Sequence, residues 1–83
     1  MAIIAENPRS YVLFEDGKGW ILTVVGGAGG QRDVSLRLSE AERASVRADR
    51  GFIRQLATDV AANPARFAHR KLEAPVWPRP GER

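Results

Sequence analysis

Four arginines of the chain, Arg43, Arg47, Arg50 and Arg54, are spaced by four, three and four residues. On an α-helix this spacing places all four guanidinium groups on one face, within about 16 Å of helix length. A guanidinium group binds carboxylate and phosphate groups through pairs of parallel hydrogen bonds. The row therefore predicts a binding surface for an acidic protein or for a nucleic acid. A solvated, charged helix face without a partner is the simpler alternative.

Glycines gather in a second segment, residues 26–32, which read GGAGGQR. Phosphate-binding loops use glycines so that backbone N–H groups can approach a phosphate, but such loops open a helix. The P-loop also ends in lysine followed by serine or threonine. Here residues 34–38 alternate as a strand does, and no lysine follows the last glycine. We therefore expect a hairpin loop that binds no nucleotide and no other cofactor.

The stretch GAGGQ at residues 27–31 resembles the loop of class I peptide-chain release factors and the related peptidyl-tRNA hydrolases. In that family the glutamine assists the attack of water on the peptidyl-tRNA ester, and the glycines let the backbone approach the RNA end. The resemblance implies that Gly29, Gly30 and Gln31 would carry this activity here. It covers five residues, and residues 32–35 read RDVS where the family usually has asparagine and lysine.

The remaining titratable residues do not form a catalytic or metal-binding pattern. The chain has no cysteine and one histidine, His69, so the usual zinc ligand sets are absent. Glu15 and Asp16 are adjacent in a predicted turn, where their side chains diverge. We therefore predict a protein that is not an enzyme and that holds no metal and no small-molecule cofactor.

The net charge of +3 is unevenly distributed along the chain. Residues 1–42 carry four basic and six acidic groups, whereas residues 43–83 carry nine basic and four acidic groups. Such asymmetry favours an anionic partner. No apolar run reaches the length of a membrane span, and the first residues do not read as a secretory signal. Because alanine and arginine are frequent and arginine outnumbers lysine, we expect a cytoplasmic bacterial protein without membrane contact.

Three apolar runs predict a three-stranded antiparallel β-meander. The runs at residues 11–14 and 19–25 flank the pair Asp16-Gly17, which is typical of a hairpin with positive φ at both turn positions. Residues 34–38 alternate between apolar and polar, as in a strand with one wet face. A short additional strand at residues 2–5 is left open.

A helix is predicted to begin at Ser39, because Ser39 and Glu42 have the spacing of a capping box. An apolar stripe then keeps one helical phase over residues 39–62, which favours one long amphipathic helix. Asp49 falls within this stripe and suits the N-cap of a second helix better. The alternatives of one helix or two nearly collinear helices therefore both stand.

The predicted fold class is α+β. The meander is expected to pack on one face against the long helix and against a short C-terminal helix at residues 65–70, which follows Asn63-Pro64. The predicted core comprises Val34, Leu36, Leu38, Phe52, Ile53, Leu56, Val60 and Phe67. We expect one domain over residues 1–71, followed by a proline-rich tail, residues 72–83, that is extended or disordered.

These features predict a small protein-interaction module whose specific role is unknown. It would bind an acidic partner, or a partner that pairs with a sheet edge, through the four arginines. Self-association is a natural variant, because a three-stranded sheet leaves its edges open. A nucleic-acid-binding protein that uses the same arginines is the first alternative. Peptidyl-tRNA hydrolase-like activity from the glycine loop is the second.

Overall fold

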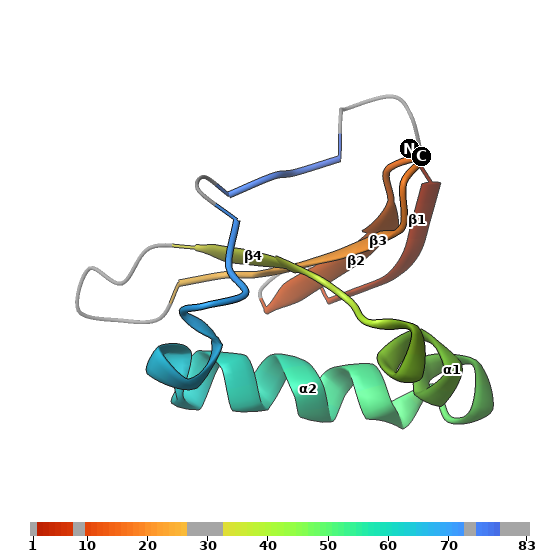
Figure 1. Cartoon of the computed structure of the whole chain (residues 1–83). Coiled ribbons are helices and arrows are strands. Elements are labelled where there is room, and N and C mark those ends of the chain that lie inside the picture. The colour runs from red at the N-terminus through yellow and green to blue at the C-terminus, as the bar shows by residue number, and fades with distance from the viewer. Residues whose placement is uncertain (1, 8–9, 27–32, 73–74, 79–83) are drawn as a thin grey trace.

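The computed structural model describes residues 2–7, 10–26, 33–72 and 75–78 of the chain. Its elements are, in order, β1 (Ala2–Asn7), β2 (Tyr11–Glu15), β3 (Trp20–Val24), β4 (Val34–Arg37), α1 (Glu40–Ala48), α2 (Gly51–Ala62) and the 3-10 helix η1 (Pro64–Phe67). The strands form one antiparallel sheet in the order of the chain. Figure 1 shows both α-helices under one face of the sheet and the C-terminal segment over the other. The fold is thus α+β, as predicted.

The prediction of three strands is wrong by one, because the open alternative at the N-terminus forms the edge strand β1. In the register of β1 with β2, Ile3 lies opposite Phe14 and Ala5 lies opposite Leu13. Ile4 between them is the extra residue of a β-bulge. A bulge interrupts the alternation of faces by which a strand is recognised in a sequence. This irregularity explains why the pattern of β1 was weak.

The turn between β2 and β3 lies at the predicted place but is longer than a two-residue Asp-Gly turn. It spans residues 16–19. The positive φ angles are those of Gly17 (91°) and Gly19 (157°), whereas Asp16 has a negative φ. Asp16 instead closes the turn. Its N–H donates to the Gly19 carbonyl (3.0 Å), and its carboxylate accepts from the Lys18 N–H (2.9 Å).

The stripe predicted as one helix or two collinear helices folds as two helices that are not collinear. The predicted capping box is confirmed: the Glu42 N–H donates to the Ser39 hydroxyl (3.2 Å), and the Ser39 N–H donates to the Glu42 carboxylate (2.8 Å). After α1, Asp49 is extended, and its carboxylate accepts from the Gly51 N–H (2.9 Å). A continuous helix would place the Asp49 carboxylate in the apolar stripe, where it would be costly to bury. The break between α1 and α2 instead leaves Asp49 exposed. In Figure 1, α1 is seen nearly end-on while α2 lies across the view.

The short C-terminal helix is a 3-10 helix over Pro64–Phe67 rather than an α-helix over residues 65–70. Short 3-10 turns of this kind commonly serve as connectors. Phe67 is half-buried and packs against the main core. The N–H groups of Arg70 and Lys71 both donate to the Phe67 carbonyl, at 2.9 and 3.0 Å, and so turn the chain back toward the sheet.

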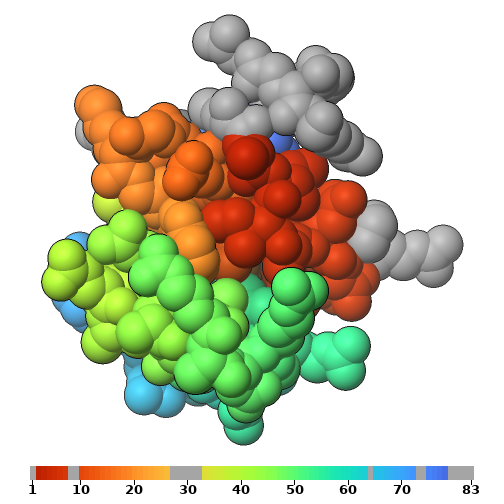
Figure 2. Space-filling view, turned by 90° about the vertical axis from the view of Figure 1, so that its right-hand side faces the viewer, coloured from red at the N-terminus to blue at the C-terminus, as the bar shows by residue number. Residues whose placement is uncertain are grey.

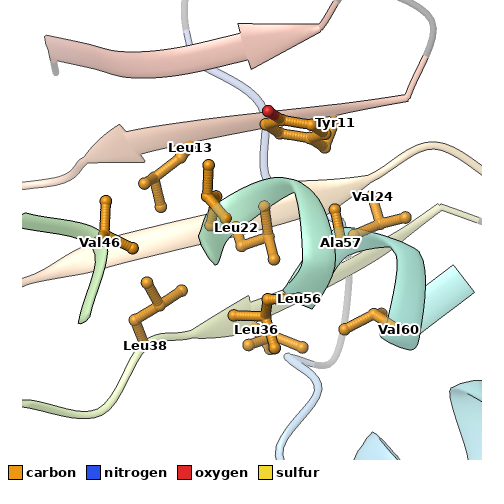
Figure 3. Packing of buried hydrophobic residues seen from close by; sticks show 11 residues of the cluster. Tyr11, Leu13, Leu22, Val24, Leu36, Leu38, Val46, Leu56, Ala57 and Val60 are labelled. Carbon is orange, nitrogen blue, oxygen red and sulfur yellow. The ribbon is translucent and has the colours of Figure 1, made fainter. Parts of the chain in front are cut away.

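The main core lies between the helices and one face of the sheet (Figure 3). Of the predicted core residues, the buried ones are Leu36, Leu38, Ile53, Leu56 and Val60, and the half-buried ones are Val34, Phe52 and Phe67. The buried core residues that the prediction omitted are Tyr11, Leu13, Leu22, Val24, Val46 and Ala57. Most of these omitted residues lie on β2 and β3, where both faces are apolar and the pattern does not reveal which face meets the helices.

A second apolar cluster covers the opposite face of the sheet. It comprises buried Val12, Phe14 and Ile21 and, packed against them, Ile3, Leu72 and Val76. The chain reaches this face along the outer edge of β4, where Lys71 forms a bridge with Leu36 and the Leu72 N–H donates to the Ser35 carbonyl (2.8 Å). We call residues 71–72 and 75–78 the C-terminal strap. The strap covers the sheet face that the helices leave open.

Two buried hydroxyl groups hold the strap at Val76. The Val76 N–H donates to Ser35 Oγ (2.8 Å), and the Thr23 hydroxyl donates to the Val76 carbonyl. Thr23 Oγ1 and Ser35 Oγ are 2.6 Å apart. Because the Thr23 hydrogen is used on Val76, the Ser35 hydroxyl donates to Thr23, and the three hydrogen bonds close a ring. Thr23 and Ser35 are 0% and 1% exposed, so the ring satisfies groups that water cannot reach.

Replacing Ser35 with alanine should lower the free energy of unfolding by about 1–3 kcal/mol, the usual cost of leaving buried polar groups unsatisfied. The substitution removes the acceptor of the Val76 N–H. Urea denaturation followed by circular dichroism measures the effect. The matched control is Ser45→Ala on α1, which should change stability by less than about 0.5 kcal/mol because alanine favours a helix. Equal stability of Ser35→Ala and the wild type would contradict the ring.

Two ion pairs join distant parts of the fold. The Arg37 guanidinium donates from Nη1 and Nη2 to the two carboxylate oxygens of Asp16, at 3.1 and 2.9 Å, and so ties the β2–β3 turn to β4. Arg70 donates to both carboxylate oxygens of Glu42 and to the Arg37 carbonyl (3.2 Å), and so ties α1 to the segment after η1. The hydrogen bonds from Arg37 lower the pKa of Asp16 from 3.8 to about 2, with partial burial opposing them. For Glu42, burial acts to raise the pKa, but hydrogen bonds from Arg70 and from the Ser39 N–H outweigh it, and the net shift is downward.

Acid should remove the contribution of the Asp16–Arg37 pair in a defined pH window. Because folding lowers the pKa of Asp16, its stabilisation is complete above the ordinary value of 3.8 and is lost as the pH falls through about 2. Asp16→Asn should cost about 1 kcal/mol at neutral pH, since Arg37 is partly screened by solvent. The variant should also flatten the loss of stability across this window. Urea denaturation at a series of pH values tests this, with exposed Asp59→Asn as the control. Identical pH profiles for the two variants would contradict the assignment.

Candidate interaction surface

Of the four predicted binding arginines, the structure brings two together. Arg47 and Arg50 are exposed and line the same hollow. Arg54 is exposed as well but lines a different hollow. Arg43 is half-buried, and its Nη2 lies 3.8 Å from the Glu40 carboxylate. The two arginines that flank the break between α1 and α2 thus share one hollow, and the candidate surface centres on this middle pair.

The hollow shared by Arg47 and Arg50 has a volume of about 290 Å³ and lies between β1, the start of β3 and the two helices. Its other walls are apolar and consist of Ile4, Ala5, Trp20, Val46 and Ile53. Consecutive residues of a regular strand point to opposite faces. Because of the bulge in β1, both Ile4 and Ala5 reach this one hollow. Ile4 is also one of two large apolar side chains that are exposed within the described part of the chain.

Trp20 connects the apolar walls with the arginines. The guanidinium carbon of Arg47 lies over the Trp20 ring, 5.2 Å from its centroid, which is the geometry of a cation–π contact. Trp20 is the first residue of β3, and its carbonyl accepts from the Leu38 N–H (3.0 Å) just before α1. This bond ties the sheet to the start of the helical layer. Arg47 thus lies on a ring that the sheet itself positions.

The hollow opens beside a sheet edge. Within the described ranges β1 pairs with β2 alone, whereas the edge strand on the other side, β4, is bridged by the strap at Lys71. Figure 2 shows β1, in red, at the surface directly above the green helices. Residues 2–5 of β1 are apolar, and Glu6 is its one charged residue. A strand of this kind presents backbone N–H and C=O groups that another chain can pair with.

Arg54 belongs to a second hollow of about 600 Å³ between α2 and the ends of the strands. Its lining includes Tyr11 and Val24 from the sheet and Ala57, Thr58 and Ala61 from α2. No ion pair or cation–π contact involves Arg54 within the part of the chain that the structure describes. The second hollow lacks the combination of paired arginines and an aromatic ring that marks the first.

The predicted catalytic alternative concerns Gly29, Gly30 and Gln31, which lie outside the described residues. Peptidyl-tRNA hydrolase-like activity therefore stays a prediction. Among the described residues, no three histidine, cysteine, aspartate or glutamate side chains come together as a metal site would require. His69 is exposed near the end of the helical layer.

Comparison with protein-family models, with curated proteins and with solved structures gives no match to this chain. Within the described ranges, none of the helices is long and apolar enough to span a membrane. Sequence reasoning found Arg47 and Arg50 but missed Ile4 and Trp20. The one local signal for Ile4 was an apolar pair near the N-terminus, and nothing in its neighbourhood linked it to arginines so much later in the chain.

The contact between Arg47 and Trp20 can be tested by fluorescence. The chain has two tryptophans, so Trp77→Phe leaves Trp20 as the single emitter. In this background Arg47→Ala should shift the emission to longer wavelength and increase quenching by acrylamide, because the ring loses its cover. The cost in stability should be about 0.5–1 kcal/mol, as for exposed cation–π pairs. Arg66→Ala, at an exposed position of η1, is the control, and an Arg47→Ala spectrum identical to it would contradict the contact.

Proposed function

We propose that this protein is an interaction module that binds an acidic segment of a partner protein at the hollow beside β1. The observation that supports this most is the combination of two exposed arginines with apolar walls at a sheet edge. Neither Arg47 nor Arg50 forms an ion pair within the described part of the chain. Their guanidinium groups can give charge-assisted hydrogen bonds to carboxylates, while the walls bury apolar groups of the same partner.

A second copy of this chain is a poorer partner. Antiparallel pairing of two β1 strands about a two-fold axis would bring Arg47 and Arg50 of both copies to the same face. Glu6, the one acidic residue of β1, lies opposite Val12, which belongs to the face under the strap. Residues opposite each other in a sheet share a face, so Glu6 of a second copy would lie on the wrong side to neutralise the arginines. The surface therefore favours a different, acidic chain over self-association.

Charge reversal tests the proposal with two labelled probes, an end-blocked octaglutamate and a twelve-nucleotide single-stranded RNA. The wild type should bind octaglutamate at low salt, and the double variant Arg47→Glu/Arg50→Glu should bind it at least about tenfold more weakly. The control is Arg54→Glu/Arg66→Glu, which changes the net charge equally but lies away from the hollow and should retain binding. Fluorescence anisotropy gives all the affinities.

Two outcomes would overturn the proposal. The first is no binding of octaglutamate at low salt, and the second is an equal loss in the two double variants, which would indicate general electrostatics. Preferential binding of the RNA, with a steep salt dependence and a loss shared by both variants, would instead favour the nucleic-acid alternative.

A further inference from the structure

The geometry points to a more specific partner: an extended segment that adds to β1 as a short fifth strand and places one apolar side chain between two acidic ones on the helix side. This inference rests on the proposed function and defines how the acidic partner is held. It follows from three features of the described residues. These are the β1 edge, which pairs with β2 alone, the lining of the hollow, and the pairing of the strap with β4 at the other edge of the sheet.

The strap provides an internal example of strand addition. At β4 an extended segment pairs through the Leu36–Lys71 bridge and through the bond from the Leu72 N–H to the Ser35 carbonyl. The segment is then secured by side chains, because Leu72 and Val76 enter the apolar cluster of that face. Backbone pairing at an edge together with alternate side chains in a neighbouring apolar site is the general mode of β-strand addition. At β1 the described residues provide both parts of this arrangement, a sheet edge that pairs on one side alone and a neighbouring apolar hollow.

The bulge determines how long the added strand can be. It interrupts β1 at Ile4, so continuous pairing along the whole strand is disfavoured. The hollow lies beside the bulge, with Ile4 and Ala5 as its walls on the sheet side. A partner strand whose central residue lies at the hollow therefore needs only a few residues on either side of that central residue. A segment of about seven residues is long enough to reach across the hollow at the usual rise of about 3.4 Å per residue.

The lining of the hollow determines the order of side chains on that segment. Alternate residues of a strand share a face and lie about 7 Å apart. A branched apolar side chain at the centre would enter the pocket between Ile4 and Trp20. The next residues on the same face, one on each side, would then be placed to meet Arg47 and Arg50. The expected pattern is therefore acidic, any, apolar, any, acidic, and it reads the same in both chain directions.

Two peptides of identical composition test the pattern. Thr-Glu-Thr-Leu-Thr-Glu-Thr places leucine and both glutamates on one face of a strand, whereas Thr-Thr-Glu-Leu-Glu-Thr-Thr places the glutamates on the face opposite leucine. Both are used with blocked ends and a fluorescent label. The first should bind at least about tenfold more tightly than the second, and Arg47→Glu/Arg50→Glu should abolish the difference. Arg54→Glu/Arg66→Glu should preserve it.

The backbone contribution is tested with two N-methylated versions of the first peptide. One carries N-methyl groups on the leucine and both glutamates, and the other carries them on the two inner threonines. Because N–H groups of alternate residues point to the same side of a strand, one version should lose binding and the other should retain it. Backbone amides of residues 2–6 should also exchange more slowly with solvent when the unmodified peptide is bound.

The outcomes separate this inference from the proposed function. Equal binding of the two isomeric peptides, both sensitive to Arg47→Glu/Arg50→Glu, would overturn strand addition and leave an acidic partner in place. Binding of octaglutamate without binding of either heptapeptide would do the same. Equal tolerance of both N-methylated versions would exclude backbone pairing and indicate a partner held by side chains alone. Failure of octaglutamate and of both heptapeptides would overturn the proposed function together with the inference.

Discussion

Strands β2 and β3 are apolar on both faces, and this constraint governs the rest of the molecule. Leu13 and Leu22 face the helices, while Phe14 and Ile21 face the strap, and all four are buried. A two-layer arrangement would leave one of these faces in water, at a cost of about 25 cal/mol for each Å² of apolar surface. The chain therefore needs a second cover after its helices, and the strap provides it. In returning along β4 the strap also pairs with that edge of the sheet at Ser35 and Leu36, so that within the described ranges β1 is the edge strand that pairs on one side alone.

The arginines of the chain divide according to the carboxylates around them. Arg37 and Arg70 each hold a carboxylate with two hydrogen bonds and so connect elements far apart in the sequence. Arg47 lies on an aromatic ring, and Arg50 lies at the joint between the two helices, exposed in both cases. A bidentate pair in a partly buried place stabilises the fold, whereas an exposed guanidinium beside an apolar hollow is better suited to a ligand. The surroundings of each arginine, rather than its spacing along the chain, separate the arginines that hold carboxylates within the fold from the two that are proposed to bind a partner.

Local signals predicted the parts of the fold that local interactions form. Ser39 and Glu42 formed the expected capping box because both bonds lie within one helical turn. Asp16 and Gly17 marked the position of the β2–β3 turn, but the turn is longer than predicted. The Asp16 carboxylate accepts from the nearby Lys18 N–H and also from the distant Arg37 side chain. The parts that depend on distant residues were not predictable in the same way. The strap, for example, is held by hydroxyl groups of β3 and β4, and no periodicity within residues 72–83 reveals them.

The candidate site belongs to this second kind, and its dependence on the helix break shows why. A helical wheel drawn over residues 39–62 assumes one helix axis. On that axis all four arginines, Arg43, Arg47, Arg50 and Arg54, lie on the same face, and nothing distinguishes the central pair. Asp49 ends that axis, because its side chain and its carbonyl accept from N–H groups at the start of α2. With the chain redirected there, Arg50 lines the same hollow as Arg47 and the bulged strand β1. The helix break at Asp49 thus shapes the surface that is proposed to recognise a partner. The angle between α1 and α2 is therefore part of the geometry of the proposed site, because both helices line the hollow, α1 through Val46 and Arg47 and α2 through Ile53.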